Sequence, residues 1–359
     1  MNHRAIAILL ITALAVFAYG ENAVQSPAPD PVRAFPRVGG CQVLRCDFHM
    51  HTLHSDGKLT PVERVEEAVA FGYDAIAITD HGNFKAYEEA LPRATELGLV
   101  LIRGMETGIA KREHFVALDF AASYEPRDPH GWSLDEGQEQ VFYQHQWRLL
   151  VKDSGAFVIY AHPHMGLDEP VLWAIRNGLL KGIEVKNEVV GQGWNTVNSH
   201  GTWFYPQALD WAIEHDLTVF ANSDVHAARN VNGLPVTLVL VRKRSPDGVM
   251  EALRTGRTIA WFDGMLWGKE NLLKQLIEAV IKVTREEVVN IANESPVALT
   301  AVLENGDHVE LPPFASATIE GGPSLRALTM TWDNVWIRSD QNLRTTHTVR
   351  TARQVPVAP

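Results

Sequence analysis

The stretch VLRCDFHMH, residues 43–51, runs from an apolar, strand-like segment straight into two histidines. His49 and His51 are two positions apart, so in a strand their side chains point to the same face. Asp47 shares that face one step deeper, where it is expected to orient one of the imidazoles. A single His-X-His is weak evidence for a metal site, so the interpretation depends on the rest of the chain.

Histidines and carboxylates recur after the next strand-like runs. Besides SDG, which follows the first histidine pair, the clusters read TDHG (79–82), GMET with EHF (104–107 and 113–115), YAHPH (160–164) and NSDVH (222–226). Active sites of α/β barrels are built at the carboxyl ends of the strands, so we expect these clusters to meet at one sheet edge. So many nitrogen and oxygen ligands favour a multinuclear metal site. A metal-dependent hydrolase is therefore the leading interpretation.

Composition narrows the classes of function. The chain has 359 residues, 46% of them hydrophobic, which is enough to bury a sizeable core in one large domain and a small one. The formal net charge of -11 excludes a fold-wide basic surface, so no extended nucleic acid is expected as a partner. An anionic substrate would instead depend on the local charge of metal ions.

Residues 1–20 have the pattern of a cleavable secretory signal. A short basic start precedes the apolar run Ala5–Ala18, and Ala18-Tyr19-Gly20 supplies small residues for cleavage. A membrane anchor is the alternative, but a helix over that run spans only about 20 Å against a bilayer core of about 30 Å. We expect a secreted or periplasmic protein with no transmembrane span in the mature chain, and a Pro- and Gly-rich tether over residues 21–40.

The two cysteines, Cys41 and Cys46, are not expected to form a disulfide. In one extended strand their Cα atoms lie about 16 Å apart, at roughly 3.3 Å per residue, which is too far for the bond. A disulfide would require Cys41 to lie in a loop before the strand. Because no Cys-X-X-Cys pair occurs, any metal here is held by nitrogen and oxygen ligands.

Strand-like runs alternate with helical patterns up to about residue 264. The first helix begins after Thr60, with a capping box and with Pro61 in its first turn. The alternation predicts an α/β architecture of parallel strands and crossover helices, with enough units for a barrel over residues 41–264.

From residue 265 to residue 359 the pattern changes to a linker helix followed by short strands. Asn271–Lys282 is the expected helix. The Asn305-Gly306 pair predicts one hairpin, and Asp333-Asn334 predicts a second. We interpret this region as a small, sandwich-like antiparallel β domain that contains none of the histidine and carboxylate clusters.

In this order, His-X-His with Ser-Asp-Gly, Thr-Asp-His, Gly-X-Glu, His-Pro and Ser-Asp-X-His resemble the motifs of the PHP (polymerase and histidinol phosphatase) superfamily. The resemblance covers roughly residues 43–262 and implies a distorted (β/α)7 barrel with two or three divalent metal ions. It implies three ligand groups, and the residues of the first two are also the expected catalytic residues. The groups are His49, His51, Glu106 and Asp224; Asp56, His81 and His226; and Glu106, as a bridge, with His114 and His162.

We expect a phosphoesterase that hydrolyses a phosphate mono- or diester of a small molecule. In this hypothesis a metal-bridging hydroxide attacks phosphorus, and Mn, Zn or Fe suits the mixed ligands. Lys186 and Arg229 are the expected phosphate contacts, because each closely follows a strand end. His164 is the candidate acid for the leaving group.

Two other functions stay open. A metal amidohydrolase acting on C–N bonds also starts from His-X-His, although no strand-end motif offers the metal-bridging lysine that is usual there. A non-catalytic metal- or ligand-binding module is the second alternative. For the C-terminal β domain the expectation is that it seals one end of the barrel, with a homo-oligomer contact or an envelope partner as the alternatives.

Overall fold

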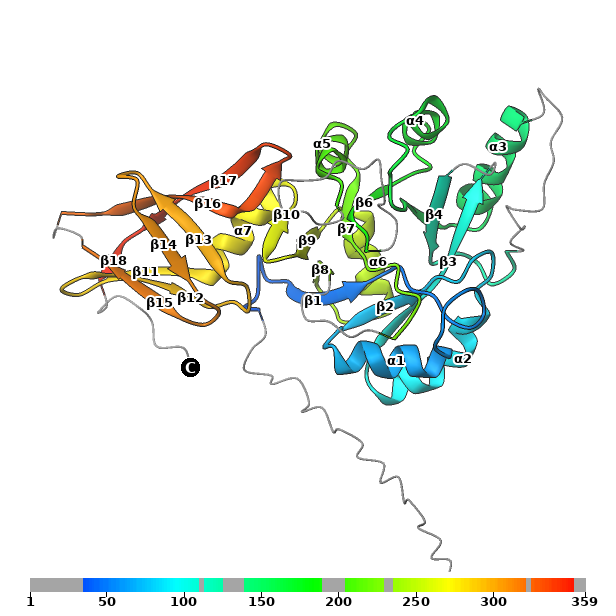
Figure 1. Cartoon of the computed structure of the whole chain (residues 1–359), viewed down its shortest axis with the longest axis horizontal. Helices are drawn as coiled ribbons and strands as arrows, with labels where there is room; N and C mark the ends of the chain where they lie inside the picture. Colours follow the sequence, from blue (N-terminus) through cyan, green and yellow to red (C-terminus); the bar gives the residue numbers. More distant parts are fainter. Residues whose placement is uncertain are drawn as a thin grey trace, which may run out of the picture.

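A long mixed sheet runs through the described chain (Figure 1). The structure, a computed structural model, describes residues 35–109, 113–124, 139–188, 204–228, 235–320 and 324–351. The strands of its N-terminal part are β1 (Gln42–Asp47), β2 (Ala75–Ile78), β3 (Val100–Ile109), β4 (Glu113–Leu118), β5 (Phe157–Tyr160), β6 (Gly182–Lys186), β7 (Thr218–Ala221), β8 (Val236–Val241), β9 (Thr258–Phe262) and β10 (Met265–Trp267). The order from β10 is β10-β9-β8-β1-β2-β3-β4-β5-β6-β7.

This part of the sheet is rich in parallel pairs but not wholly parallel. Strands β1, β2 and β3 pair in parallel, as do β5, β6 and β7. Strand β4 is antiparallel to both β3 and β5, and β8 is antiparallel to β1 and β9. Only residues 110–112 separate β3 from β4, too few for the crossover that a parallel pair needs. The predicted α/β class is confirmed: the sheet is rich in parallel pairs, as expected, with β4 and β8 as its antiparallel members.

Threonine side chains connect the last strand of this order, β7, to β8 and β9. In β8, Thr237 Oγ1 accepts from the N–H of Ala221 at 3.0 Å and donates to its carbonyl at 2.9 Å. In β9, Thr258 Oγ1 donates to the carbonyl of Val219 at 2.7 Å. The sheet therefore curves far enough to bring β7 beside strands that lie on the other side of β1.

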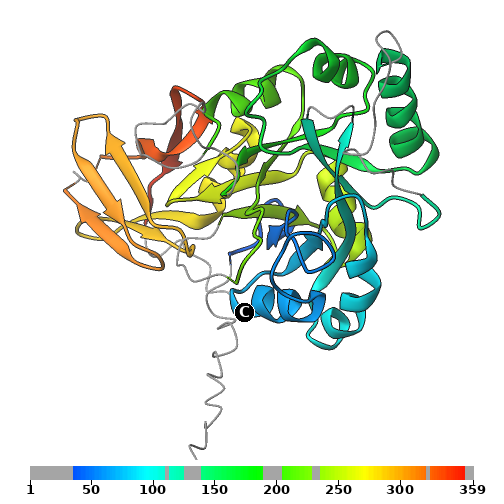
Figure 2. The ribbon, with the colours of Figure 1, turned by 45° about the vertical axis from the view of Figure 1, so that its right-hand side comes forward.

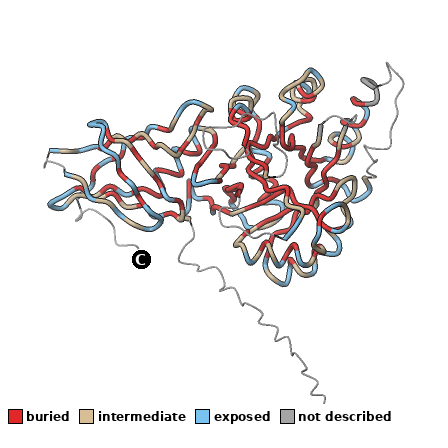
Figure 3. The backbone as a smooth tube through the Cα atoms, in the orientation of Figure 1, coloured by how far each residue is buried: buried red, intermediate tan, exposed pale blue. Residues whose placement is uncertain are grey.

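Helices cover the outside of the curved sheet (Figures 1 and 2). They are α1 (Pro61–Ala70), α2 (Lys85–Glu96), α3 (Glu139–Trp147), the π-helical turn η3 (Arg148–Asp153), α4 (Glu169–Arg176), α5 (Pro206–Glu214) and α6 (Pro246–Arg254). The predicted capping box is present: the Glu63 N–H donates to the Thr60 side chain, and the Glu63 carboxylate accepts from the Thr60 N–H. Buried residues follow the strands, and the exposed residues gather on the outer faces of the helices (Figure 3).

The C-terminal β region follows α7 (Glu270–Val280), whose apolar stripe packs into the core shared with the rest of the chain. Its strands are β11 (Ile281–Arg285), β12 (Val289–Asn293), β13 (Leu299–Leu303), β14 (His308–Leu311), β15 (Ser316–Ile319), β16 (Ala327–Arg338), β17 (Gln341–Thr348) and β18 (Arg350–Thr351). Strands β14, β13 and β16 continue the long sheet beyond β10, with β17 paired to β16. Strands β15, β12, β11 and β18 form a second sheet. The predicted Asn305-Gly306 hairpin is confirmed, since β13 and β14 pair antiparallel across it.

The second predicted hairpin is wrong. Asp333-Asn334 lies inside β16, and the chain turns back only after Arg338 to pair with β17. The ladder with β17 shifts its register at this point, and the Asn334 side chain donates to the carbonyls of Gly264 and Ala298. The pair is therefore a bulge that fastens β16 to its neighbours, a use of Asn that looks like a turn in the sequence.

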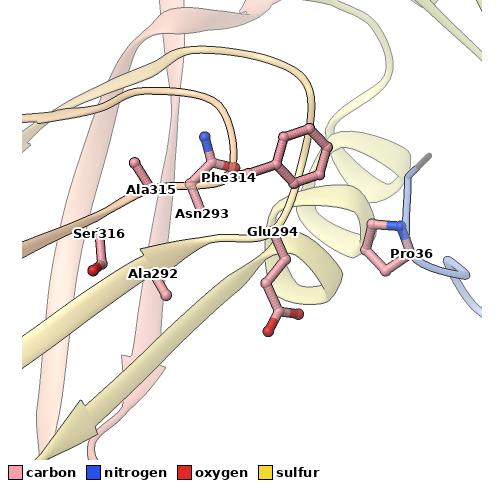
Figure 4. Close-up of a pocket in the computed structure, with 7 residues that line it drawn as sticks. All are labelled: Pro36, Ala292, Asn293, Glu294, Phe314, Ala315 and Ser316. Atoms are coloured by element: carbon pink, nitrogen blue, oxygen red, sulfur yellow. The ribbon is translucent and has the colours of Figure 1, made fainter. Parts of the chain in front are cut away.

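The first described residues lie between the two parts of the molecule. The Phe35 ring meets Trp261 edge-on at 6.0 Å, and Pro36 lines a small pocket with Asn293 and Phe314 of the C-terminal β region (Figure 4). Cys41 and Cys46 are free thiols, as expected. In the described ranges, no helix combines the length and apolar character that crossing a bilayer requires.

Candidate metal centre

One edge of the N-terminal sheet collects the histidine and carboxylate clusters. The loops after β1, β2, β5 and β7 carry most of them. Two positions differ from the prediction that every cluster lies beyond a strand's carboxyl end: Glu106 lies within β3, and His114 lies at the start of β4. Because β4 is antiparallel to β3, its amino end reaches the same edge as the carboxyl ends of its neighbours.

A closed group of four side chains lies deepest. It consists of His49, His51, Glu106 and Asp224, all of them buried. The Nε2 atom of His49 lies 3.2 Å from Glu106 Oε2 and 3.3 Å from Asp224 Oδ1. The Nε2 atom of His51 lies 2.9 Å from the same Asp224 oxygen and 3.2 Å from Glu106 Oε2. All four side chains thus aim at one point.

An open group shares His51 and faces the surface. Its other members are Asp56, His81 and His226. Asp56 lies 3.5 Å from His81 Nε2, 3.3 Å from His226 Nε2 and 3.6 Å from His51 Nδ1. The Asp56 side chain is 55% exposed, against 0–3% for the members of the closed group. Solvent therefore reaches the centre from this side.

A third group surrounds the second oxygen of Glu106. His114 Nδ1 lies 2.9 Å and His162 Nε2 lies 3.1 Å from Glu106 Oε1. His81 Nδ1 lies 3.2 Å from Glu106 Oε2 and joins the group. The two oxygens of Glu106 thus face different groups of histidines, the arrangement of a carboxylate that can bridge two cations.

Divalent cations fit this arrangement. The Nε2 atoms of His49 and His51 and the Oδ1 atom of Asp224 are buried and have no hydrogen-bond partner. Buried polar atoms without partners are costly, at about 1–3 kcal/mol each. Imidazole nitrogens and carboxylate oxygens that converge in this way suit divalent cations.

The electrostatics of the closed group also favour bound cations. Burial alone would lower the pKa of His49, but Asp224, Glu106 and Glu184 raise it well above its ordinary value. Burial likewise opposes protonation of His51, yet the carboxylates of Asp224 and Glu106, 2.9 and 3.2 Å from its Nε2 atom, raise its pKa from 6.5 to about 9. Burial would raise the pKa of Glu106, but the neighbouring histidines hold it well below its ordinary value. The carboxylates attract positive charge, which protons supply where cations would otherwise be bound.

Supporting residues were only partly predicted. The Oδ1 atom of Asp47 accepts from the backbone N–H groups of His49 and Ser223. The His49 imidazole is bonded instead by Glu184, at 2.9 Å from its Nδ1 atom. Glu184 was not predicted; the available signal was a carboxylate inside the apolar run GIEVK of β6. Asp80 accepts from the Thr52 N–H and hydroxyl, at 2.7 and 2.6 Å, and so holds the loop that follows His51.

The residues predicted to act on the substrate lie in surroundings that differ from one another. Lys186 ends β6 with its side chain almost wholly buried, 3.8 Å from Asp263 and over the Phe262 ring, and burial lowers its pKa. His164 is half-buried, and its Nδ1 lies 2.7 Å from the carbonyl of His162. Burial lowers the pKa of His164. Arg229 lies outside the described residues.

Comparisons with known proteins agree with this geometry. Residues 47–171 match the model of the PHP domain, and residues 205–258 match the model described as PHP-associated. A solved two-domain protein of Bacteroides vulgatus, described as containing a predicted PHP-like metal-dependent phosphoesterase, is similar with a TM-score of 0.73 and 25% identity. The similarity covers 88% of this chain and 98% of that one.

Two curated relatives match the chain more locally. A 5'-3' exoribonuclease of Haemophilus influenzae is 38% identical over 77 residues, which are 21% of this chain and 28% of the relative. A 3',5'-nucleoside bisphosphate phosphatase of Chromobacterium violaceum is 31% identical over 83 residues, which are 23% of this chain and 29% of the relative. The chain thus spans less than a third of the length of these relatives.

Proposed function

Because this chain carries a PHP domain, we propose that it is a metal-dependent phosphoesterase acting on a phosphate mono- or diester of a small molecule. The observation that carries the proposal is the convergence of His49, His51, Glu106 and Asp224 on one point, with buried atoms that lack partners. Both curated relatives are named for cleaving phosphoester bonds, which supports the same chemistry.

The proposed ligand sets are the three groups of side chains around Glu106. The first is His49, His51, Glu106 and Asp224; the second is Asp56, His81 and His226, with His51 at its edge; the third is Glu106, His114 and His162. Two or three ions of Mn, Zn or Fe would, when bound, lower the pKa of a coordinated water from about 15.7 toward 7 and clamp phosphate oxygens. The buried side excludes bulk water, and the open side at Asp56 admits substrate.

Two side chains are proposed to act on the substrate itself. Lys186 is a buried ammonium 3.8 Å from the Asp263 carboxylate, and a phosphate group of the substrate is proposed as a further anionic partner. His164, whose Nδ1 atom lies 2.7 Å from the carbonyl of His162, is the proposed acid that gives a proton to the leaving oxygen. Arg229 is retained as a further phosphate contact.

Neither alternative chemistry has an observation in its favour. Amidohydrolysis in a related site would use a metal-bridging lysine, and in the described part of the chain Lys186 belongs to none of the three groups. A binding module without catalysis would also present an open site at Asp56, so the hydrolysis assay below is what separates it from an enzyme.

Three proposals concern the rest of the chain. Residues 1–20 are proposed as a secretory signal and residues 21–40 as a tether, which would make the mature protein secreted or periplasmic. Residues 41–264 and 265–359 are proposed as two domains. The second is proposed to carry any homo-oligomer contact, which light scattering of the whole chain and of residues 21–264 would test.

The test of function is hydrolysis of matched aryl phosphate mono- and diesters by the whole chain with Mn(II), with His49→Ala as control. Turnover that the control loses would support the phosphoesterase and assign the bond class. Retained turnover in the control, or none with either ester while two or more ions remain bound, would overturn the proposal.

A further inference from the structure

The carboxylate of Glu184 is fully buried and accepts four hydrogen bonds. Its Oε1 accepts from His49 Nδ1 at 2.9 Å and from Asn222 Nδ2 at 2.9 Å. Its Oε2 accepts from the backbone N–H of His162 at 2.7 Å and from Asn187 Nδ2 at 3.0 Å. Four donors satisfy a buried carboxylate without any cation, so Glu184 itself needs no metal ion.

Three of these four bonds lead to proposed metal ligands. His49 is bonded through its imidazole and His162 through its backbone. Asn187 Nδ2 also lies 3.2 Å from Asp224 Oδ2, so it links Glu184 to a third ligand. One buried side chain on β6 therefore fixes members of two groups that come from β1, β5 and β7.

Each bond has a physical consequence for the ligand that it holds. When His49 Nδ1–H donates to Glu184, the lone pair is left on Nε2, the atom that faces Glu106 and Asp224. His162 has a φ of 27°, a backbone conformation that non-glycine residues rarely adopt, and the bond to its N–H helps to hold that conformation.

Asp80 serves the opposite side of the centre. This buried carboxylate accepts from Thr52 and from the Ser55 hydroxyl at 2.6 Å, and these residues flank the loop that carries Asp56. Glu184 and Asp80 thus form a matched pair of buried carboxylates: one behind the closed group, the other behind the open group.

We propose that Glu184 is a positioning residue that sets the metal affinity of the closed group and of the neighbouring site at His162. Asp80 sets the affinity of the open group. The inference rests on the proposed function only in that both require metal binding at this edge.

Glutamine is an informative replacement for Glu184. The amide of Glu184→Gln has nearly the size of the carboxylate, but whichever way it is turned its NH2 group faces two of the four donors. Glutamine therefore keeps the volume and removes the acceptor. Asp80→Asn makes the corresponding change behind the open group.

The experiment titrates Mn(II) into the chelator-stripped whole chain by calorimetry, which reads affinity without reference to activity. Wild type, Glu184→Gln and Asp80→Asn are each compared with and without His226→Ala, which removes a ligand of the open group alone. Glu184→Gln is expected to weaken at least one ion by about 10–100-fold, and the loss should persist in the His226→Ala background. The loss caused by Asp80→Asn should largely disappear in that background.

Unchanged Mn(II) affinity in Glu184→Gln, or a loss that vanishes with His226→Ala, would overturn the inference. If Glu184→Gln fails to fold, Asn187→Ala removes one of the four bonds to Glu184 together with the link to Asp224, and it should weaken the same ion. An unchanged affinity in a folded Asn187→Ala protein would then count against the proposal. Metal binding as expected with no ester hydrolysis would overturn the proposed function and leave this inference standing.

Discussion

Buried polar groups have different surroundings in the C-terminal β region and at the edge of the N-terminal sheet that carries the three histidine and carboxylate groups, which we call the metal edge. In the former, Asn293 donates to three carbonyls at 2.7–3.0 Å, and its Oδ1 accepts from the N–H and hydroxyl of Ser295. Trp332, Thr345 and His347 form a second chain of bonds at 2.8 Å. These networks are complete, so they stabilise the fold and leave nothing to bind a ligand.

At the metal edge the members of the closed group converge without satisfying all of their polar atoms. Three buried atoms, in His49, His51 and Asp224, lack partners although they lie close together. Partnerless buried atoms occur near the C-terminal region too, in Trp267 and Trp336, but these are neutral indole N–H donors. The difference teaches that a cluster of charged and unsatisfied groups, rather than burial of polar groups as such, indicates a ligand site.

The largest expected effect that separates the two regions is that of His51→Ala. His51 belongs to both the closed and the open group, so its loss should reduce esterase turnover by more than about 100-fold with Mn(II) present. His54→Ala is the matched control, because His54 lies in the same loop but pairs with Glu89 on the surface at 2.8 Å. Steady-state kinetics of the two variants measure the difference. Equal losses would mean that the loop, and not the ligand, matters.

Asn293→Ala should have the reverse effect. Each buried group that loses its partner costs about 1–3 kcal/mol, so the free energy of unfolding should fall by at least that amount. The activity of the folded fraction should stay within about twofold of wild type, since the C-terminal region contains none of the three groups. Urea denaturation and turnover below the transition measure both quantities. A large loss of turnover in the folded protein would mean that activity depends on the C-terminal region, and it would contradict the separation of the two regions.

Local sequence rules predicted much of the fold. They failed where a contact with a residue far away in the chain determines the local structure. The capping box at Thr60 and the Asn305-Gly306 hairpin depend on neighbours in the chain, and both are present. Asp333-Asn334 has the same local signature as a turn, yet Asn334 bonds Gly264, 70 positions away, and becomes a bulge. A sequence pattern holds no information about that contact.

The same reason separates the residues of the candidate site that were predicted from those that were not. The proposed ligand residues could be named from the sequence because each lies within a short motif beside a strand. Glu184 was not found, because its role depends on His49, which is 135 positions away, and on donors from two other strands. The antiparallel direction of β4 was also missed, although it is what brings His114 to the site.

The pH dependence of stability in the chelator-treated protein gives a further test of the difference between the two regions. The folded-state pKa of His51, about 9, lies above the ordinary value of 6.5, so the folded protein binds this proton more tightly than the unfolded chain. Its stabilisation is complete below pH 6.5 and is lost as the pH rises through 9, by at most about 1.4 kcal/mol per pH unit. Thermal melts between pH 6.5 and 9.5 should show this decline. His51→Gln should flatten it, and so should added Mn(II), since cations then replace the proton.

The smallest effect is expected at His347, and it has the opposite sign. Burial, with a smaller contribution from Lys282, lowers the pKa of His347 from 6.5 to about 4, so the folded state favours the neutral ring that bonds Thr345. Its contribution to stability is present above pH 6.5 and is lost as the pH falls toward 4, by less than about 1.4 kcal/mol per pH unit. His347→Gln should reduce this acid sensitivity, and added Mn(II) should leave it unchanged because no metal group contacts His347. Acid sensitivity that disappears with Mn(II) would place its origin at the metal edge, and the two regions would no longer be independent.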